Sequence, residues 1–149
     1  MKVLVVEDDY LQADWIQRNL ERALPGITIY YINTELEFRS RLDYIAGATP
    51  DVIVMDIMLR WANPDPNLQL PPEEVKEGGF YRAGLRCQKL LANDERTKDI
   101  PVIFYTVLEP YDLESELQQL SGNITYLRKE SDLTSLIYRI RDLTQRGKQ

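Results

Sequence analysis

Short apolar runs alternate along the chain with longer segments in which apolar residues recur every three or four positions. Runs of about four consecutive apolar residues are typical of strands buried on both faces of a sheet, and the periodic segments are typical of amphipathic helices. The pattern predicts five strands, at residues 2–6, 27–32, 52–55, 102–105 and 124–127.

Capping and breaking residues place the predicted helices between these strands. The first helix begins near residue 10 and is ended by Pro25-Gly26. The second opens with Thr34 and Glu37, which have the spacing of a capping box. The third and fourth helices are expected at about residues 80–91 and 110–121.

The last helix shows the clearest periodicity, with Leu133, Leu136, Ile137 and Ile140 on one face. Ser131 or Asp132 is expected to cap its start, and Arg146 and Lys148 suit the dipole at its end.

Five strands that alternate with five helices indicate an α/β fold with a parallel sheet, helices on both faces and right-handed crossovers. The length of 149 residues predicts a single domain. The alternation is interrupted once, at about residues 60–78, where four prolines lie in a stretch without periodicity. Connections of this length are usually functional or disordered.

Composition narrows the function classes. Hydrophobic residues make up 44% and charged residues 28% of the chain, as in soluble globular proteins. No apolar run has membrane-spanning length, and Met1 leads directly into a strand, so we expect a cytoplasmic protein without a signal peptide or membrane contact. The net charge of -6 argues against direct nucleic acid binding.

Histidine is absent, which excludes histidine-dependent triads, histidine metal ligands and a phosphohistidine carried by this chain. The single cysteine, Cys87, cannot form an internal disulfide, and its place in a helical pattern predicts a buried thiol. Any phosphoryl chemistry must therefore use carboxylates, with the donor supplied from outside.

Residues whose side chains can take part in catalysis or metal binding follow four of the five predicted strands. Glu7 and Asp8 follow the first, Asp56 the third and Thr106 the fourth, and Lys129 comes two residues after the fifth. In a doubly wound sheet the carboxyl ends of the strands meet at a crevice. We therefore expect these five side chains to share one pocket.

The charges of this group predict a metal ion. Two carboxylates about 4 Å apart repel by about 4 kcal/mol at an effective dielectric constant near 20, so three do not sit together unpaired. An all-oxygen site with open positions suits Mg²⁺. Thr106 and Lys129 are suited to hold oxygens of a transferred phosphoryl group, with Asp56 as the nucleophile that forms an acyl phosphate.

Each of these residues also has an ordinary explanation. An acidic pair after a strand is more often a helix cap or a charge at a helix N-terminus, and a single aspartate or lysine there is more often a surface residue. The occurrence of all five in this order, at the ends of different strands, favours the functional interpretation.

The chain resembles the receiver domain of two-component response regulators, the CheY-like domain. The resemblance covers nearly the whole chain outside the insertion and rests on residues 3–9, 52–59, 101–106 and 126–129 together. It implies a flavodoxin-like doubly wound sheet with strand order 2-1-3-4-5.

The resemblance also implies roles for single residues. Asp56 is the implied phosphoacceptor, Thr106 and Lys129 hold the phosphoryl group, and Tyr126 matches the family's aromatic switch. The implied Mg²⁺ ligands are Asp56, Asp8, the main-chain carbonyl of Met58, and Glu7 acting through water.

Three features depart from the family pattern. Glu130 follows Lys129 where the family usually has proline, which puts the usual cis peptide bond in doubt. Val107 follows Thr106 where a small residue is usual, which is expected to narrow access to Asp56. Asp56 and Thr106 are 50 positions apart, more than is usual, because of the insertion.

The leading interpretation is a phosphorylation-operated switch, a regulatory domain rather than an independent enzyme. A histidine kinase or histidine phosphotransfer protein is expected to phosphorylate Asp56, adding charge that orders Thr106 and the loop after it. The face made by the fourth helix, the fifth strand and the last helix would then change partners, binding a downstream protein or a second copy of the chain.

Two alternatives remain. A receiver-like module that docks partners without being phosphorylated is left open by Val107 and the insertion. An independent phosphatase or a flavin carrier fits less well, because the loop after the first strand is acidic and no Asp-x-Asp follows the third strand.

The insertion is expected to be a functional surface, because it begins four residues after Asp56. Four apolar side chains could pack over the crevice or dock a partner: Trp61, Leu68, Leu70 and Val75. A mobile solvated loop is the alternative.

Overall fold

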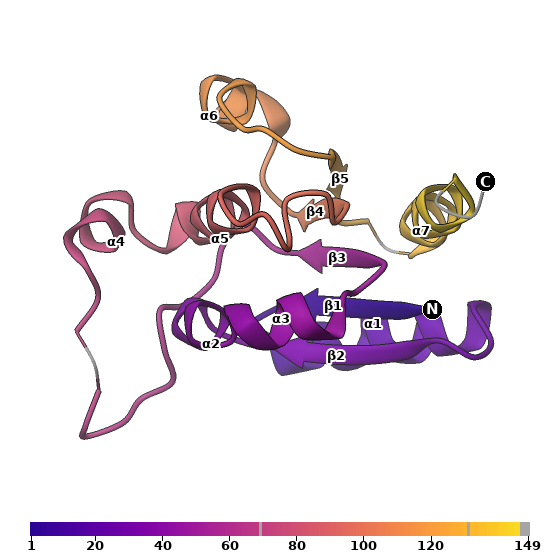
Figure 1. Cartoon of the computed structure of the whole chain (residues 1–149), viewed down its shortest axis with the longest axis horizontal. Helices are drawn as coiled ribbons and strands as arrows, with labels where there is room; N and C mark the ends of the chain where they lie inside the picture. Colours follow the sequence, from indigo (N-terminus) through magenta and orange to yellow (C-terminus); the bar gives the residue numbers. More distant parts are fainter. Residues whose placement is uncertain (69, 131, 147–149) are drawn as a thin grey trace.

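A computed structural model describes residues 1–68, 70–130 and 132–146 and contains one parallel sheet of order β2-β1-β3-β4-β5 (Figure 1). Both the predicted sheet order and the five predicted strands are confirmed, with bounds that differ by at most one residue. The strands are β1 (Lys2–Val6), β2 (Thr28–Ile32), β3 (Val52–Met55), β4 (Val102–Thr106) and β5 (Ile124–Arg128).

The described helices are more numerous than predicted, because the second predicted helix is broken and the insertion contains one. The break is at Arg41, whose N–H closes the first piece by donating to the carbonyls of Glu37 and Phe38. The α-helices are α1 (Tyr10–Ala23), α2 (Glu35–Ser40), α3 (Leu42–Ala48), α4 (Glu73–Gly78), α5 (Ala83–Ala92), α6 (Glu114–Gln118) and α7 (Thr134–Arg146), with 3-10 turns at Phe80–Arg82 and Pro110–Leu113.

The sheet buries both of its faces, as the apolar runs predict. Alternate side chains of β1 show this: Val3 and Val5 pack with α1 and α7, whereas Leu4 and Val6 pack with α2, α3 and α5. The helices therefore form two layers around the sheet (Figure 1). Cys87 lies in the second of these layers and is fully buried, as predicted.

Two predicted helix starts have the expected caps. The Thr34 hydroxyl accepts a hydrogen bond from the Glu37 N–H at 3.1 Å. Asp132 accepts one from the Thr134 N–H at 3.0 Å. Ser131, Lys148 and the side chain of Arg146 lie outside the described residues.

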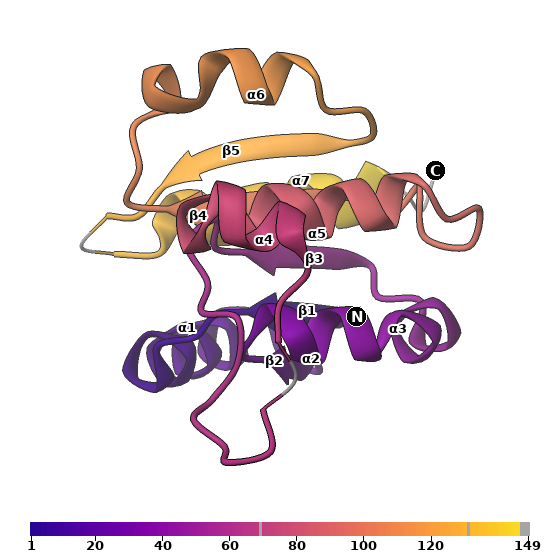
Figure 2. The same ribbon diagram turned by 90° about the vertical axis from the view of Figure 1, so that its left-hand side faces the viewer.

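The insertion is attached to the fold at both ends. At its root, the carbonyls of Arg60 and Trp61 accept hydrogen bonds from the N–H groups of Glu35 and Leu36, which open α2. Residues 62–68, which follow this root, extend away from the sheet (Figure 2). Leu68 and Leu70 are exposed there, so these two side chains do not pack over the crevice, whereas Val75 is buried.

A buried carboxylate joins α2, α4 and α5. The side chain of Glu35 has no exposed surface and accepts two hydrogen bonds from Arg86 of α5, at 2.8 and 2.7 Å, and two from Arg39 of α2. Arg39 also pairs with Glu74 of α4 at 2.9 Å. This network holds the end of the insertion against the helical layer.

No helix in the described ranges is long and apolar enough to cross a membrane.

Candidate functional site

Asp56 lies directly after β3 at the carboxyl edge of the sheet. Its N–H donates to the Val6 carbonyl at 3.0 Å, which continues the pairing of β3 with β1. Its buried carboxylate accepts hydrogen bonds at Oδ1 from the N–H of Ile57 at 2.7 Å and of Met58 at 3.3 Å. The backbone therefore fixes the direction of this carboxylate and leaves Oδ2 for other partners.

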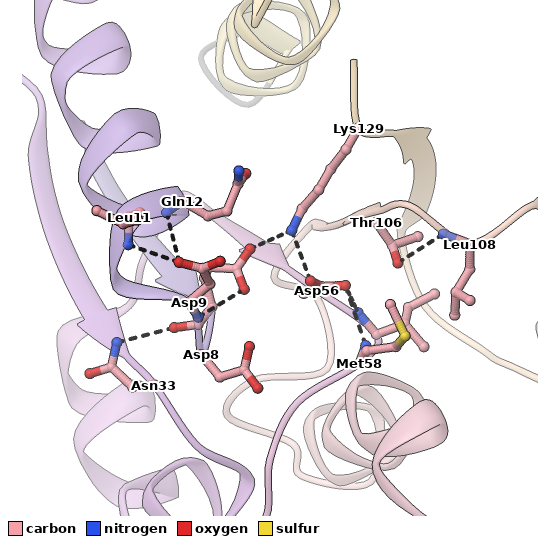
Figure 3. Close-up of polar contacts among 12 residues, drawn as sticks. Asp8, Asp9, Leu11, Gln12, Asn33, Asp56, Met58, Thr106, Leu108 and Lys129 are labelled. Atoms are coloured by element: carbon pink, nitrogen blue, oxygen red, sulfur yellow. Dashed lines mark hydrogen bonds and ion pairs between the residues drawn. The ribbon is translucent and has the colours of Figure 1, made fainter. Parts of the chain in front are cut away.

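Lys129 supplies the cation that faces Asp56. Its N–H donates to the Thr106 carbonyl at 2.7 Å, which places it at the same edge of the sheet. Its ammonium lies 2.9 Å from Asp56 Oδ2 and also contacts the Glu7 carboxylate (Figure 3). Burial lowers the pKa of Lys129, but the nearby charges of Asp56 and Glu7 outweigh it and raise that pKa overall.

Glu7 is buried beside the same ammonium. Burial first, and then repulsion by Asp56, raise the pKa of Glu7 to about 7, although Lys129 opposes the shift. Two of the three predicted carboxylates, Glu7 and Asp56, therefore share one ammonium, which offsets their repulsion only in part.

The next two acidic residues have other partners. Asp8 turns away from Lys129 (Figure 3); its Oδ2 accepts a hydrogen bond from the Arg60 N–H at 2.9 Å and lies 3.6 Å from the Arg60 guanidinium. Asp9 caps α1 by accepting from the N–H groups of Leu11 and Gln12. The ordinary explanation of an acidic cluster, a helix cap, thus applies to Asp9.

Thr106 and Tyr126 are joined through one residue. The buried Thr106 hydroxyl accepts a hydrogen bond from the Leu108 N–H at 3.4 Å (Figure 3). The Leu108 carbonyl in turn accepts one from the hydroxyl of the half-buried Tyr126. The loop after β4 therefore links the two residues assigned to the switch.

One cavity of about 880 Å³ connects most of these residues. Val107 lines this cavity and is half exposed, and its expected narrowing of the access to Asp56 stays a prediction. The predicted site residues that line the cavity are Glu7, Asp8, Asp56, Met58 and Lys129. Thr106 was expected in the same pocket but does not line it, because its side chain is fully buried. The peptide bonds of the described residues are all trans, including the one between Lys129 and Glu130.

Gly84 is a site residue that the sequence analysis missed. Its N–H donates to the Ile57 carbonyl at 2.8 Å, and a Cβ at this position would lie 2.3 Å from the main-chain oxygen of Asp56. A glycine at the start of α5 therefore allows that helix to pack directly against the loop that carries Asp56.

The oxygen donors at this site are of the kind that binds Mg²⁺. Their side chains would have to move before they could surround the ion. Among the residues described, no three Asp, Glu, Cys or His side chains are grouped to hold a metal. Lys129 lies between Glu7 and Asp56, and Arg60 holds Asp8. All the donors are oxygens at one cavity, where carboxylates outnumber ammonium groups, and this set suits a hard divalent cation.

No protein-family model matches the chain. The chain is 29% identical to the DNA-binding dual master transcriptional regulator RpaA of Synechocystis, over 97% of the chain and 49% of that protein. It is 26% identical to the heme response regulator HssR of Staphylococcus haemolyticus, over 98% of the chain and 52% of that protein. The chain thus spans about half the length of these relatives.

Solved receiver domains have the same fold. The receiver domain of a Francisella response regulator is 25% identical, with a TM-score of 0.66 and 98% of each chain covered. The receiver domain of a signal transduction histidine kinase from Syntrophus aciditrophicus has a TM-score of 0.71 at 18% identity, covering 99% of this chain and 92% of that one. With the sheet order and the relatives above, these similarities show the fold of CheY-like receiver domains and support the resemblance to two-component response regulators.

Proposed function

We propose that this protein is a phosphorylation-operated switch whose phosphoacceptor is Asp56. One observation carries the proposal: the Asp56 carboxylate is buried in a cavity with its Oδ2 paired to the Lys129 ammonium. Lys129 would hold an oxygen of the incoming phosphoryl group and offset its charge. The donor is proposed to be a phosphohistidine of a histidine kinase or phosphotransfer protein, because this chain contains no histidine.

Mg²⁺ is proposed as the cofactor. Asp56, Asp8 and the Met58 carbonyl would hold it directly, and Glu7 would act through water. When bound, the ion would neutralise charge on the carboxylates and on the phosphoryl oxygens. Asp8 must leave the Arg60 guanidinium to take part, so Arg60 competes with the metal.

The signal is proposed to pass through the loop after β4. A phosphoryl oxygen on Asp56 would attract the Thr106 hydroxyl, which now accepts from the Leu108 N–H. Movement of Leu108 would change the bond that its carbonyl accepts from Tyr126. Tyr126 belongs to β5, so the change would reach the face made by α6, β5 and α7, where a downstream protein or a second copy of this chain would bind.

The test is phosphorylation by acetyl phosphate with Mg²⁺, followed by intact mass spectrometry. The proposal predicts one added phosphoryl group on the wild-type protein and on Asp99→Asn, whose aspartate is exposed, and none on Asp56→Asn. A folded wild-type protein that gains no phosphoryl group would instead favour a receiver-like docking module. The proposed role is regulatory, and direct binding of nucleic acid by these residues is not expected.

A further inference from the structure

The cavity at Asp56 is lined by apolar as well as charged side chains. Asp56 and Lys129 contribute an ion pair, and Phe80 and Val107 contribute apolar surface. The Phe80 side chain is 52% exposed and thus retains a free surface at the cavity. Phe80 belongs to neither of the two core clusters.

Phe80 comes from the end of the insertion and is held at the site by the backbone. Its carbonyl accepts a hydrogen bond at 3.2 Å from the N–H of Leu59, a fully buried residue three positions after Asp56. The preceding turn is at Gly79, whose φ of 67° suits glycine. Phe80 is therefore tied to the same loop as the phosphoacceptor.

The ring is also supported from one side. Phe80 and Tyr81 are stacked with ring centroids 4.2 Å apart and an interplanar angle of 28°. This stacking restricts the ring, and a restricted aromatic surface loses little conformational entropy when another flat ring packs against it.

We propose that Phe80 packs against the imidazole ring of the phosphohistidine donor and so selects donors that carry their phosphoryl group on an aromatic ring. This inference rests on the proposed function. In the transfer, an oxygen of the Asp56 carboxylate forms a bond to phosphorus while the phosphorus–nitrogen bond of the donor breaks. The leaving nitrogen keeps the electron pair, and neutral imidazole departs when its other nitrogen bears the proton.

Two small donors separate ring recognition from phosphoryl transfer itself. Phosphoimidazole carries the aromatic ring and acetyl phosphate does not. The rate of Asp56 phosphorylation is measured with each donor, in Mg²⁺, by intact mass spectrometry. In Phe80→Ala the ratio of the phosphoimidazole rate to the acetyl phosphate rate is expected to fall about two- to tenfold, the size of one aromatic pair.

Three further variants make the result specific. Phe80→Tyr keeps an aromatic ring and should restore the wild-type ratio, whereas Phe80→Leu keeps only apolar volume and should not. Tyr138→Ala removes an aromatic ring that is 67% exposed on α7, outside the lining of the cavity, and should leave the ratio unchanged.

An unchanged ratio in Phe80→Ala, or a ratio restored equally by leucine and tyrosine, would overturn the role of the ring. Beryllofluoride binding to the wild-type protein with Mg²⁺ gives a separate readout. If beryllofluoride binds while the ratio does not respond to Phe80, the inference fails and the proposed function stands. If the wild-type protein takes up neither donor and binds no beryllofluoride, both fail.

Discussion

Substitution of Gly84 by alanine should disturb the loop that carries Asp56. The added Cβ would lie 2.3 Å from the main-chain oxygen of Asp56 and 2.7 Å from the Ile57 Cα, whereas ordinary van der Waals contact begins at 3.4 Å. The backbone of one segment must therefore move by about 1 Å, because neither contact involves a flexible side chain. Overpacking of this kind costs about 1–3 kcal/mol of unfolding free energy.

The same shift should reduce phosphorylation. The Asp56 carboxylate is oriented by the N–H groups of Ile57 and Met58, so movement of this loop turns the nucleophile. A misplacement of about 1 Å at a reacting group can reduce the rate roughly 100-fold. Urea denaturation gives the stability change, and single-turnover phosphorylation by acetyl phosphate gives the rate.

Gly47 provides the matched control for this experiment. It lies within α3, and a Cβ there would meet nothing within 4 Å. Gly47→Ala should therefore stabilise the protein by about 0.5–1 kcal/mol through helix propensity and leave phosphorylation unchanged. If Gly84→Ala matched the wild-type protein in both stability and rate, the close approach of α5 to the Asp56 loop would not constrain the site.

Three further substitutions test the neighbours of the site. Arg60→Ala should raise Mg²⁺ affinity, by up to about fivefold for a part-exposed pair, because it removes the guanidinium charge beside Asp8; a calorimetric titration that shows weaker binding would refute this. Glu35→Ala should lower the unfolding free energy by about 3–5 kcal/mol, because the buried Arg86 guanidinium loses its carboxylate partner, and urea denaturation measures it. Thr106→Ala should keep phosphorylation but remove the response of the Tyr126 ring signals by NMR, and loss of phosphorylation in the folded variant would contradict the assigned role.

The strands were predictable because their apolar runs are short, continuous and buried on both faces. The order of polar residues at the strand ends then indicated the site, and Asp56 and Lys129 lie together as this order predicts. The helix caps at Thr34 and Asp132 could also be predicted from the sequence.

The features that were missed have different causes. The break at Arg41 leaves no signal in the sequence, since arginine favours helices. The hydrogen bonds that end α2 run from the Arg41 N–H to carbonyls within that helix. The partner of Asp8 is Arg60, 52 positions away, and no spacing rule connects them. Helix α4 had a usable signal, Pro71-Pro72 followed by two glutamates, but its apolar periodicity is too short to detect.

The central claim is that the Asp56 carboxylate itself carries the phosphoryl group. Phosphorylation with Mg²⁺ and acetyl phosphate, followed by borohydride reduction and peptide mass spectrometry, locates the acyl phosphate as a homoserine. The account predicts homoserine at position 56 alone, and its loss when Mg²⁺ is withheld. Homoserine at Asp8 or Asp9, or a wild-type protein that yields none, would contradict it.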